Sequence, residues 1–165
     1  MGGRRMNDYR CPQCGVTLPH GVPAWTRRLT VAHVMTKDPA TLGPEDSLMR
    51  ALELMRKRSV RRIPVVVADM LVGLLAEGDL KRAQPSTLSA SEEEFVRVME
   101  GTPVSRIMIN NPITVTAETP LLEAARTLHT TKFGALPVMA DGRLVGIVTD
   151  NDLLGCLSDL LEQGG

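Results

Sequence analysis

The sequence predicts an α/β fold built from two pseudo-symmetric β-α-β-β-α repeats. Three observations support this: a phrase that occurs twice, a helical spacing of apolar residues in each copy, and two short apolar runs after each helix. The phrase "LVGLLAEGDLK" begins at Leu71, and "LVGIVTDNDLL" begins at Leu144, 73 positions later. Because there are only two copies, a pseudo-symmetric pair is expected rather than a solenoid.

The likeness between the copies extends well beyond that phrase. Shifted by 73 positions, residues 34–80 align with residues 107–153 without a gap. The matching pairs include Met35 with Met108, Pro39 with Pro112, Thr41 with Thr114, Glu45 with Glu118, Leu48 with Leu121, and Asp79 with Asp152. Four segments are therefore predicted: an N-terminal segment 1–28, a first repeat 29–82, a linker 83–106 and a second repeat 107–160.

A helix is predicted early in each repeat, after an extended stretch that reads "DPATL" in the first copy and "NPITV" in the second. The i, i+3, i+4, i+7 spacing of a single buried helix face is found at Leu48, Ala51, Leu52 and Met55, and again at Leu121, Ala124, Ala125 and Leu128. Asp46 and Thr119 are predicted to cap these helices, and Pro120 suits a first helical position.

Two short apolar strands are predicted after each of these helices. They are Ile63–Val67 and Leu71–Leu75 in the first repeat, and Leu136–Met139 and Leu144–Val148 in the second. Asp141-Gly142 between the second pair is a strong hairpin signal. A further helix is expected to begin near Asp79 and near Asp152. One such unit leaves a sheet face and a helix stripe uncovered, so the two units are expected to pack together.

The linker carries one further helix signal. Its beginning, residues 84–90, is predicted to be loop because of its Pro and Ser content. Ser91 with Glu94 forms a capping-box pattern, which predicts a short helix from about Glu92 to Glu100 that ends at Gly101. The segment is either a linker with one helix or a docking site for a partner.

Composition and charge exclude several classes of function. The chain has 165 residues, which is enough to bury a sizeable core without staples. Its formal net charge is zero and it has only four aromatic residues, which argues against binding to nucleic acid or to anionic membranes. No apolar run is long enough for a membrane span or a secretory signal. Three cysteines, an odd number, argue against a disulfide framework, so the cytoplasm is the expected compartment.

Four features coincide in each copy: the stretch "MTKDP" or "MINNP", a "PV" strand, an "LVG" strand, and the Gly-x-x-x-x-x-Asp that follows. Together they resemble a tandem pair of CBS domains, also called a Bateman module, over roughly residues 29–160. The linker is similar to one found in small stand-alone members of the acetoin-utilisation type. Residues 1–28 lie outside the resemblance, and the expected fold is two repeats packed as a CBS pair.

The resemblance implies a regulatory module rather than an enzyme. Such pairs bind adenosine-containing ligands, among them AMP, ADP, ATP, S-adenosylmethionine and NAD, in clefts between the repeats. They report ligand occupancy to an effector protein, which this sequence does not name, and they associate into homodimers through their helices. No nucleophile–base pair, phosphate loop or pair of catalytic carboxylates stands out. The alternative is a dimeric scaffold that contacts a partner through its N-terminal cysteines, without physiological nucleotide binding.

The binding motif of the family resembles Gly-x-x-Thr/Ser-x-x-Asp. The second repeat has it complete, as Gly146, Thr149 and Asp152 with Asp150 between them, whereas the first repeat has Ala76 in place of the hydroxyl and ends at Asp79. A carboxylate can accept hydrogen bonds from both ribose hydroxyls. A hydroxyl beside a helix N-terminus suits a ribose or phosphate oxygen. The alternative is that both aspartates only cap helices.

The resemblance also places adenine against the first extended stretch of each repeat and the residues just before its second strand. These positions are Met35–Ala40 with Val60–Arg62, and Ile109–Ile113 with Phe133–Ala135, which makes Ala40, Val60, Ile113, Phe133, Gly134 and Ala135 candidate contacts. Related clefts are completed across repeats, so Asp152 is expected to face the first set and Asp79 the second. Arg61 and Arg62 stand where basic residues of related pairs reach phosphate. The alternative for them is a solvated helix end that favours the dipole.

The segment "YRCPQCG" resembles half of a zinc ribbon. Cys11 and Cys14 would supply two of the four ligands of a closed zinc site. His20 is nearby, and His33 is a further candidate. Three outcomes stay open: a zinc site, within one chain or shared between subunits; a reducible disulfide; or an empty knuckle. His129 is expected to be an ordinary surface or core histidine.

Overall fold

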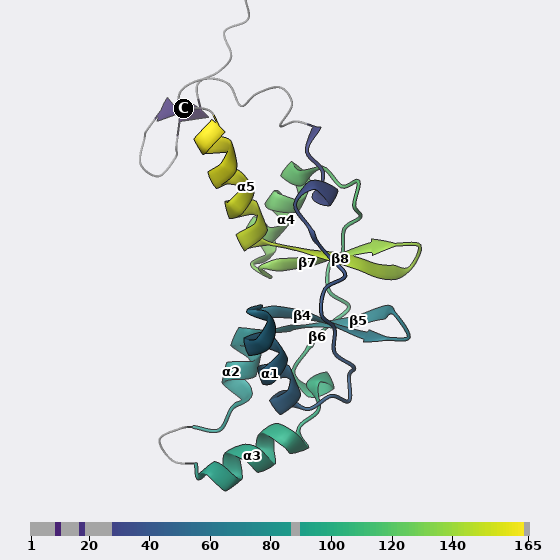
Figure 1. Ribbon diagram of the computed structural model, residues 1–165, viewed down its shortest axis with the longest axis vertical. Coiled ribbons are helices and arrows are strands. Elements are labelled where there is room, and N and C mark those ends of the chain that lie inside the picture. The colour runs from purple at the N-terminus through teal and green to yellow at the C-terminus, as the bar shows by residue number, and fades with distance from the viewer. Residues whose placement is uncertain (1–8, 11–16, 19–27, 87–89, 164–165) are drawn as a thin grey trace, which may run out of the picture.

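The computed structural model describes residues 9–10, 17–18, 28–86 and 90–163 (Figure 1). The first repeat consists of β3 (Thr36–Lys37), α1 (Leu48–Arg58), β4 (Arg62–Val67), β5 (Met70–Ala76) and α2 (Glu77–Ala83). The second repeat consists of β6 (Ile109–Asn110), α4 (Leu121–Thr131), β7 (Ala135–Ala140), β8 (Arg143–Thr149) and α5 (Asp150–Gln163). The predicted β-α-β-β-α order is confirmed in both repeats. None of the described helices is long and apolar enough to cross a bilayer.

Each repeat contributes its first strand to the sheet of the other repeat. The two three-stranded sheets have the orders β4-β5-β6 and β3-β8-β7, and all pairs are antiparallel. Lys37 pairs with Gly146 in one sheet, and Asn110 pairs with Gly73 in the other. In Figure 1 the sheets face each other at the centre, with α1 and α2 beyond one and α4 and α5 beyond the other. The repeats therefore cannot separate without breaking both sheets.

The glycine of each "LVG" strand makes room for the exchanged strand. A Cβ on Gly146 would lie 2.9 Å from Met35 Sδ, and a Cβ on Gly73 would lie 2.5 Å from Met108 Sδ. Both separations are too short for real atoms, so any side chain here would displace the methionine that crosses over from the other repeat. The repeated methionine and the repeated glycine are thus two halves of one contact.

Each repeat has its own aliphatic core, formed where its first helix packs on its hairpin. In the first repeat Leu48, Ala51 and Met55 of α1 pack with Ile63, Val65 and Leu75. In the second repeat Ala124 and Leu128 of α4 pack with Leu136, Val138 and Val148. A third, smaller cluster of Leu74, Ala135 and Ile147 joins the two sheets at the centre of the molecule.

The hairpins confirm the predicted turn at Asp141-Gly142. Both residues have positive φ, 48° and 77°, as a two-residue type I′ turn requires. The first repeat uses Ala68 and Asp69 in the same way, with φ of 49° and 64°. Each of the four strands around these turns is one or two residues longer than predicted, because each is paired to its end.

The predicted caps of the first helices are wrong by one residue. Ser47 caps α1 and accepts a hydrogen bond from Arg50 N at 3.2 Å, whereas Asp46 Oδ2 accepts from Gly43 N at 2.7 Å in the preceding turn. Thr119 likewise accepts from Thr116 N at 3.0 Å, and Pro120 is the N-cap of α4. In both repeats the expected cap closes the loop before the helix instead.

The remaining helices begin close to where they are expected. The strands β5 and β8 run directly into α2 and α5, so these helices begin at Glu77 and Asp150, two residues earlier than predicted. The linker helix α3 (Glu92–Gly101) is capped by Ser91, which accepts from Glu94 N at 3.2 Å. Met99 of α3 is fully buried in the core of the first repeat, so α3 covers that repeat.

Candidate functional site

A cleft of about 590 Å³ lies between the repeats; we call it the Asp152 cleft. Its size is in the range that holds a small ligand. It is lined by Thr36, Pro39, Ala40, Ser59, Val60, Arg61, Arg62, Gly134, Ile147, Thr149, Asp150, Asn151, Asp152 and Leu154. The first extended stretch and the α1–β4 junction of one repeat thus meet the β8–α5 junction of the other. The strand exchange produces this arrangement, because β3 pairs with β8.

Eight of the candidate residues meet in this cleft: Ala40, Val60, Arg61, Arg62, Gly134, Thr149, Asp150 and Asp152. The others lie elsewhere. Ala135 is buried in the central cluster, and Gly146 lies beneath the exchanged strand. Ile113 is 42% exposed. Phe133 and Asp79 are not among the lining residues, although the Phe133 carbonyl contacts the cleft through Arg62.

Thr149 and Asp152 hold each other through a reciprocal set of hydrogen bonds at the start of α5. Thr149 N and Thr149 Oγ1 donate to Asp152 Oδ2 at 2.8 and 2.7 Å, and Asp152 N donates back to Thr149 Oγ1 at 3.2 Å. This is a capping box with aspartate in its third position. The arrangement fixes the direction of the Asp152 carboxylate, and no other hydrogen bond to it is found among the described residues.

The equivalent junction of the first repeat is built differently. Ala76 is the N-cap of α2 and has no side chain that could form a cap. Asp79 Oδ1 instead forms an ion pair with Arg82 Nη2, three residues along the same helix. The counterpart of Arg82 in the second repeat is Gly155, so Asp152 has no such cation beside it. The sequence already contained this signal as an Asp–Arg pair at i, i+3.

Arg62 crosses from the first repeat to the second and is fixed there by main-chain atoms. Its Nε donates to the Phe133 carbonyl at 3.2 Å, and its Nη1 donates to the Arg61 carbonyl at 3.1 Å. Gly134 has φ of +70°, and any Cβ there would collide with the Arg62 guanidinium. Among the described residues no carboxylate forms an ion pair with Arg62, so its charge is available to an anion in the cleft.

Arg61 is in a more solvated position than Arg62. Its side chain is 81% exposed, and its Nε is 3.9 Å from Glu77 Oε2. Lys81 Nζ lies 2.9 Å from the other oxygen of Glu77. The hydrogen bond from Lys81 lowers the pKa of Glu77, with smaller contributions from the charges of Lys81, Arg61 and Arg62. Arg61 therefore matches the solvated alternative better than Arg62 does.

The residues proposed for zinc, Cys11, Cys14 and His20, lie outside the described residues. The strands β1 (Tyr9–Arg10) and β2 (Thr17–Leu18) bracket the two cysteines and pair antiparallel. His33 lies in the described part, where Thr30 N donates to its Nδ1 at 3.1 Å. Within that part of the chain no group of three or more His, Cys, Asp or Glu residues is arranged to hold a metal.

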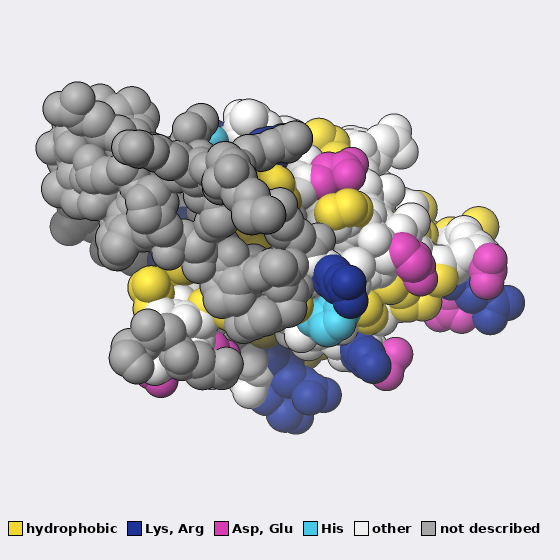
Figure 2. Space-filling view, turned by 90° about the horizontal axis from the view of Figure 1, so that it is seen from above, with side chains coloured by type: hydrophobic (Ala, Val, Ile, Leu, Met, Phe, Trp, Pro, Cys, Tyr) yellow, Lys and Arg dark blue, Asp and Glu magenta, His cyan; other side chains and the backbone are white. Residues whose placement is uncertain are grey.

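The face seen in Figure 2 mixes charges of both signs. Lys and Arg side chains alternate with Asp and Glu side chains over the visible described surface, and hydrophobic side chains lie between them. The described part of this face therefore presents no broad basic area.

Comparison with known proteins identifies the family. The CBS domain matches residues 31–86 and 104–159. A CBS domain-containing protein of Dictyostelium discoideum is 36% identical over 138 residues, which cover 82% of this chain and 95% of that protein. An acetoin utilization protein of Vibrio cholerae has a similar structure, with a TM-score of 0.70 and 31% identity over 83% of this chain and 97% of that chain.

A further solved structure is that of CBSX2 in complex with AMP. It has a TM-score of 0.66 and 32% identity, and covers 79% of this chain and 97% of that chain. The two matched segments contain the two repeats that exchange their first strands. The alignments with these three relatives cover nearly the whole length of each relative. The chain therefore belongs to the CBS domain family, as a tandem pair of CBS domains.

Proposed function

We propose that this protein is a regulatory module that binds an adenosine-containing ligand in the Asp152 cleft and reports its presence to an effector protein. The observation that carries the proposal is the convergence in one cleft of an oriented carboxylate, Asp152, and a cation, Arg62, that pairs with no carboxylate among the described residues. The known complex of CBSX2 with AMP supports the class of ligand. The proposal assigns no catalytic step to the chain.

The lining of the cleft indicates how an adenine nucleotide would lie in it. Asp152 would accept hydrogen bonds from the ribose hydroxyls, since its side chain lines the cleft from the first turn of α5. The aliphatic side chains of Ala40 and Val60 would contact the adenine ring. Arg62 would reach the phosphate, which makes AMP the most informative first probe among the adenosine ligands.

A thermal-shift panel tests the proposal at low cost. AMP at about one hundred times its dissociation constant stabilises a folded protein by roughly 2.7 kcal/mol, which for a chain of this size raises Tm by about 5–10 °C. A pyrimidine nucleotide serves as the control for adenine recognition. No shift with any adenosine ligand, in protein shown to be free of retained nucleotide, would refute the proposal.

An interaction protein without nucleotide binding is the second candidate. The observation that favours it is the capping box, because capping alone explains why Thr149 and Asp152 occur together. In that case replacing Asp152 would change stability but no ligand affinity. The thermal-shift panel therefore separates the two candidates directly.

A second part of the proposal concerns the two N-terminal cysteines. We propose that Cys11 and Cys14 bind zinc, supported by the antiparallel pairing of β1 and β2 on either side of them and by the preference of thiolates for this metal. Elemental analysis should then find between about half and one zinc ion per chain, and Cys11→Ser with Cys14→Ser should remove it while AMP binding stays unchanged.

We also propose that the chain is a homodimer, which light scattering at micromolar concentration tests.

A further inference from the structure

A second cavity, of about 400 Å³, adjoins the Asp152 cleft on the side of the first repeat; we call it the basic pocket. It lies between α1 and α2 and is lined by residues of both helices and of the junction between α1 and β4. Ser59, Val60 and Arg61 of that junction line the Asp152 cleft as well. A ligand held in the cleft can therefore continue past these three residues into the basic pocket.

The lining of the basic pocket carries an excess of positive charge. Its charged residues are the cations Arg56, Arg61 and Lys81 and the carboxylate Glu77, which gives a formal charge of +2. Glu77 holds two of these cations at the pocket, since Lys81 Nζ lies 2.9 Å from one carboxylate oxygen and Arg61 Nε 3.9 Å from the other. Arg56 forms no ion pair with any described residue. The pocket therefore suits an anionic group.

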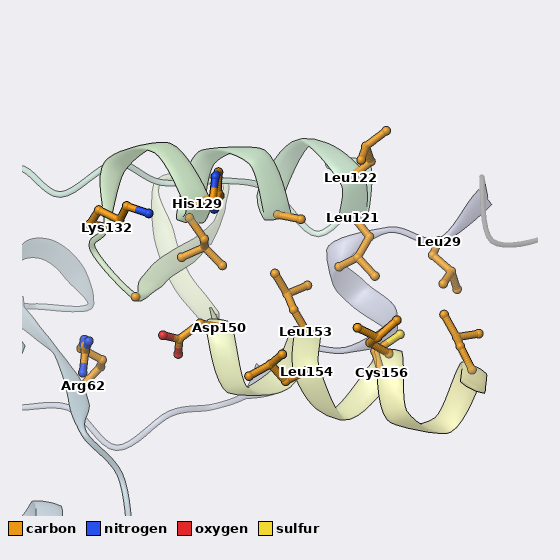
Figure 3. A pocket seen from close by; sticks show the side chains of 15 residues that line it. Leu29, Arg62, Leu121, Leu122, His129, Lys132, Asp150, Leu153, Leu154 and Cys156 are labelled. Atoms are coloured by element: carbon orange, nitrogen blue, oxygen red, sulfur yellow. The ribbon is translucent and has the colours of Figure 1, made fainter. Parts of the chain in front are cut away.

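The second repeat has a cavity in the same place, between α4 and α5 (Figure 3). Nine of the ten residues that line the basic pocket align, after the shift of 73 positions, with residues that line this second cavity. The chemistry is different, however, because Arg56 and Lys81 are replaced by His129 and Leu154, which Figure 3 shows on α4 and α5. The positive charge is therefore a property of the first repeat and not of the fold.

Arg62 marks the point at which a phosphate chain would enter the basic pocket. Its Nε and Nη1 donate to main-chain carbonyls, whereas its Nη2 donates to no described residue and remains for the first phosphate of a ligand in the cleft. The next residue, Arg61, lines both cavities, and Arg56 and Lys81 line the basic pocket alone. Guanidinium and ammonium groups both bind phosphate oxygens. The cations thus continue from the cleft in the direction that a longer phosphate chain would need.

We propose that the basic pocket is the subsite for the second and third phosphates of an adenosine ligand, so that the chain binds ATP and ADP more tightly than AMP. The inference rests on the proposed function, because it assumes adenosine in the Asp152 cleft. Arg61 and Lys81 are 81% and 65% exposed, so the advantage of each further phosphate is modest and is screened by salt. At low ionic strength ATP should bind about three- to tenfold more tightly than AMP.

Calorimetry of the full chain with AMP, ADP and ATP, at low salt and without divalent cations, measures this preference. The double variant Arg56→Gln with Lys81→Gln removes two cations from the basic pocket, so the ratio of the AMP and ATP dissociation constants should fall toward one. Lys57→Gln with Arg58→Gln is the matched control, because it removes the same charge from exposed residues of α1 that line neither cavity, and the ratio should persist. Equal thermal melts of the two variants exclude misfolding.

Three results would overturn the subsite. One is an unmodified chain that binds AMP at least as tightly as ATP. Another is a preference for ATP that survives in full in the Arg56→Gln, Lys81→Gln variant. The third is inorganic tripolyphosphate that binds as tightly as ATP, because the pocket would then take a free polyphosphate and not part of a nucleotide.

Failure of the subsite can be told apart from failure of the proposed function. If AMP binds in the Asp152 cleft and ATP gains nothing over it, the proposed function stands and the subsite is refuted. If neither nucleotide binds, both are refuted together.

Discussion

The two repeats make the same strand-to-helix junction with different side chains. In the second repeat Thr149 and Asp152 form a capping box, and the Asp152 carboxylate lines the cleft and forms no ion pair among the described residues. In the first repeat Ala76 leaves the helix without a side-chain cap, and Asp79 pairs with Arg82. The equivalent aspartates of the two repeats therefore differ: Asp152 is available to a ligand, whereas the charge of Asp79 is already neutralised by Arg82.

This difference can be expressed as a free energy of binding. A ligand at Asp79 must compete with an ion pair whose arginine is 76% exposed, which costs at most about 1 kcal/mol. It also lacks the hydroxyl of Thr149, worth roughly 0.5–1.5 kcal/mol. Together these effects weaken binding on the Asp79 side by roughly tenfold. One tighter site per chain is therefore expected.

The largest expected effect comes from Asp152→Ala. It removes an acceptor for the ribose hydroxyls, worth about 1.5–3 kcal/mol for a charged group, so AMP affinity should fall by about ten- to a hundredfold or more. It also removes the Asp152 half of the capping box at the start of α5, which costs about 1 kcal/mol of stability. Calorimetry and thermal melts measure the two losses separately.

Asp79→Ala and Asp152→Asn are the controls for that change. Asp79→Ala should leave the high-affinity site intact. Asp152→Asn keeps an oxygen that can accept from Thr149 N, so it should preserve most of the stability while losing most of the affinity. If Asp79→Ala lowers AMP affinity more than Asp152→Ala does, the tighter site lies at Asp79 and not at Asp152.

Thr149→Ala should have the next largest effect, because it gives the second repeat the residue of the first. It removes the bonds between Thr149 Oγ1 and Asp152, which hold the carboxylate in place. AMP affinity is expected to fall by about three- to tenfold. Ala76→Thr, the reverse change, should leave the tight site unaltered. If calorimetry finds equal AMP affinities for Thr149→Ala and the unmodified chain, the Thr149 hydroxyl does not contribute to the difference in affinity between the two repeats.

Arg82→Gln tests whether the ion pair between Asp79 and Arg82 weakens AMP binding at the first repeat. It releases Asp79 from its ion pair without introducing a poor helix former. In an Asp152→Asn background, where the weak site is easier to see, it should tighten residual AMP binding by a factor of about two to five. Titration at high AMP concentration measures this, and an unchanged residual affinity would show that the ion pair does not limit the Asp79 side.

The smallest effect concerns the pH dependence of the first repeat. Lys81 lowers the pKa of Glu77, so the ion pair stabilises the fold above the ordinary carboxyl pKa, and this contribution is lost as pH falls through the lowered pKa. Lys81→Ala should return the pKa of Glu77 toward its ordinary value. An NMR titration of the Glu77 carboxyl in both proteins checks this, and a Glu77 midpoint that does not rise in Lys81→Ala would contradict it.

Much of the fold could be predicted from the sequence because its signals are local. The spacing of Leu48, Ala51 and Met55 predicts α1, and Asp141-Gly142 predicts the second hairpin. The caps were displaced by one residue, since Asp46 and Ser47 both suit a cap and only tertiary context chooses between them. The exchange of β3 and β6 between the two sheets could not be predicted from the sequence. Strands of two residues show no periodicity in hydrophobicity, and the strands they pair with are distant in sequence.

The candidate site was predicted unevenly for the same reason. The motif of Thr149 and Asp152 is local, and both residues line the cleft that the strand exchange creates. The position of Arg62 over Gly134 depends on a contact between residues 72 positions apart in the chain, which spacing alone does not reveal. The spacing of Leu154, Leu157 and Leu161 on α5 can be read from the sequence, but only the structure shows that these side chains are exposed among the described residues.

A crystal structure of the full chain grown with AMP tests the central claim most directly. We expect one AMP per chain in the Asp152 cleft, with its ribose on Asp152, its adenine against Ala40 and Val60, and its phosphate at Arg62. AMP bound at Asp79 while the Asp152 cleft is empty would contradict the claim. So would a structure with no AMP in either repeat at a concentration that saturates binding in solution.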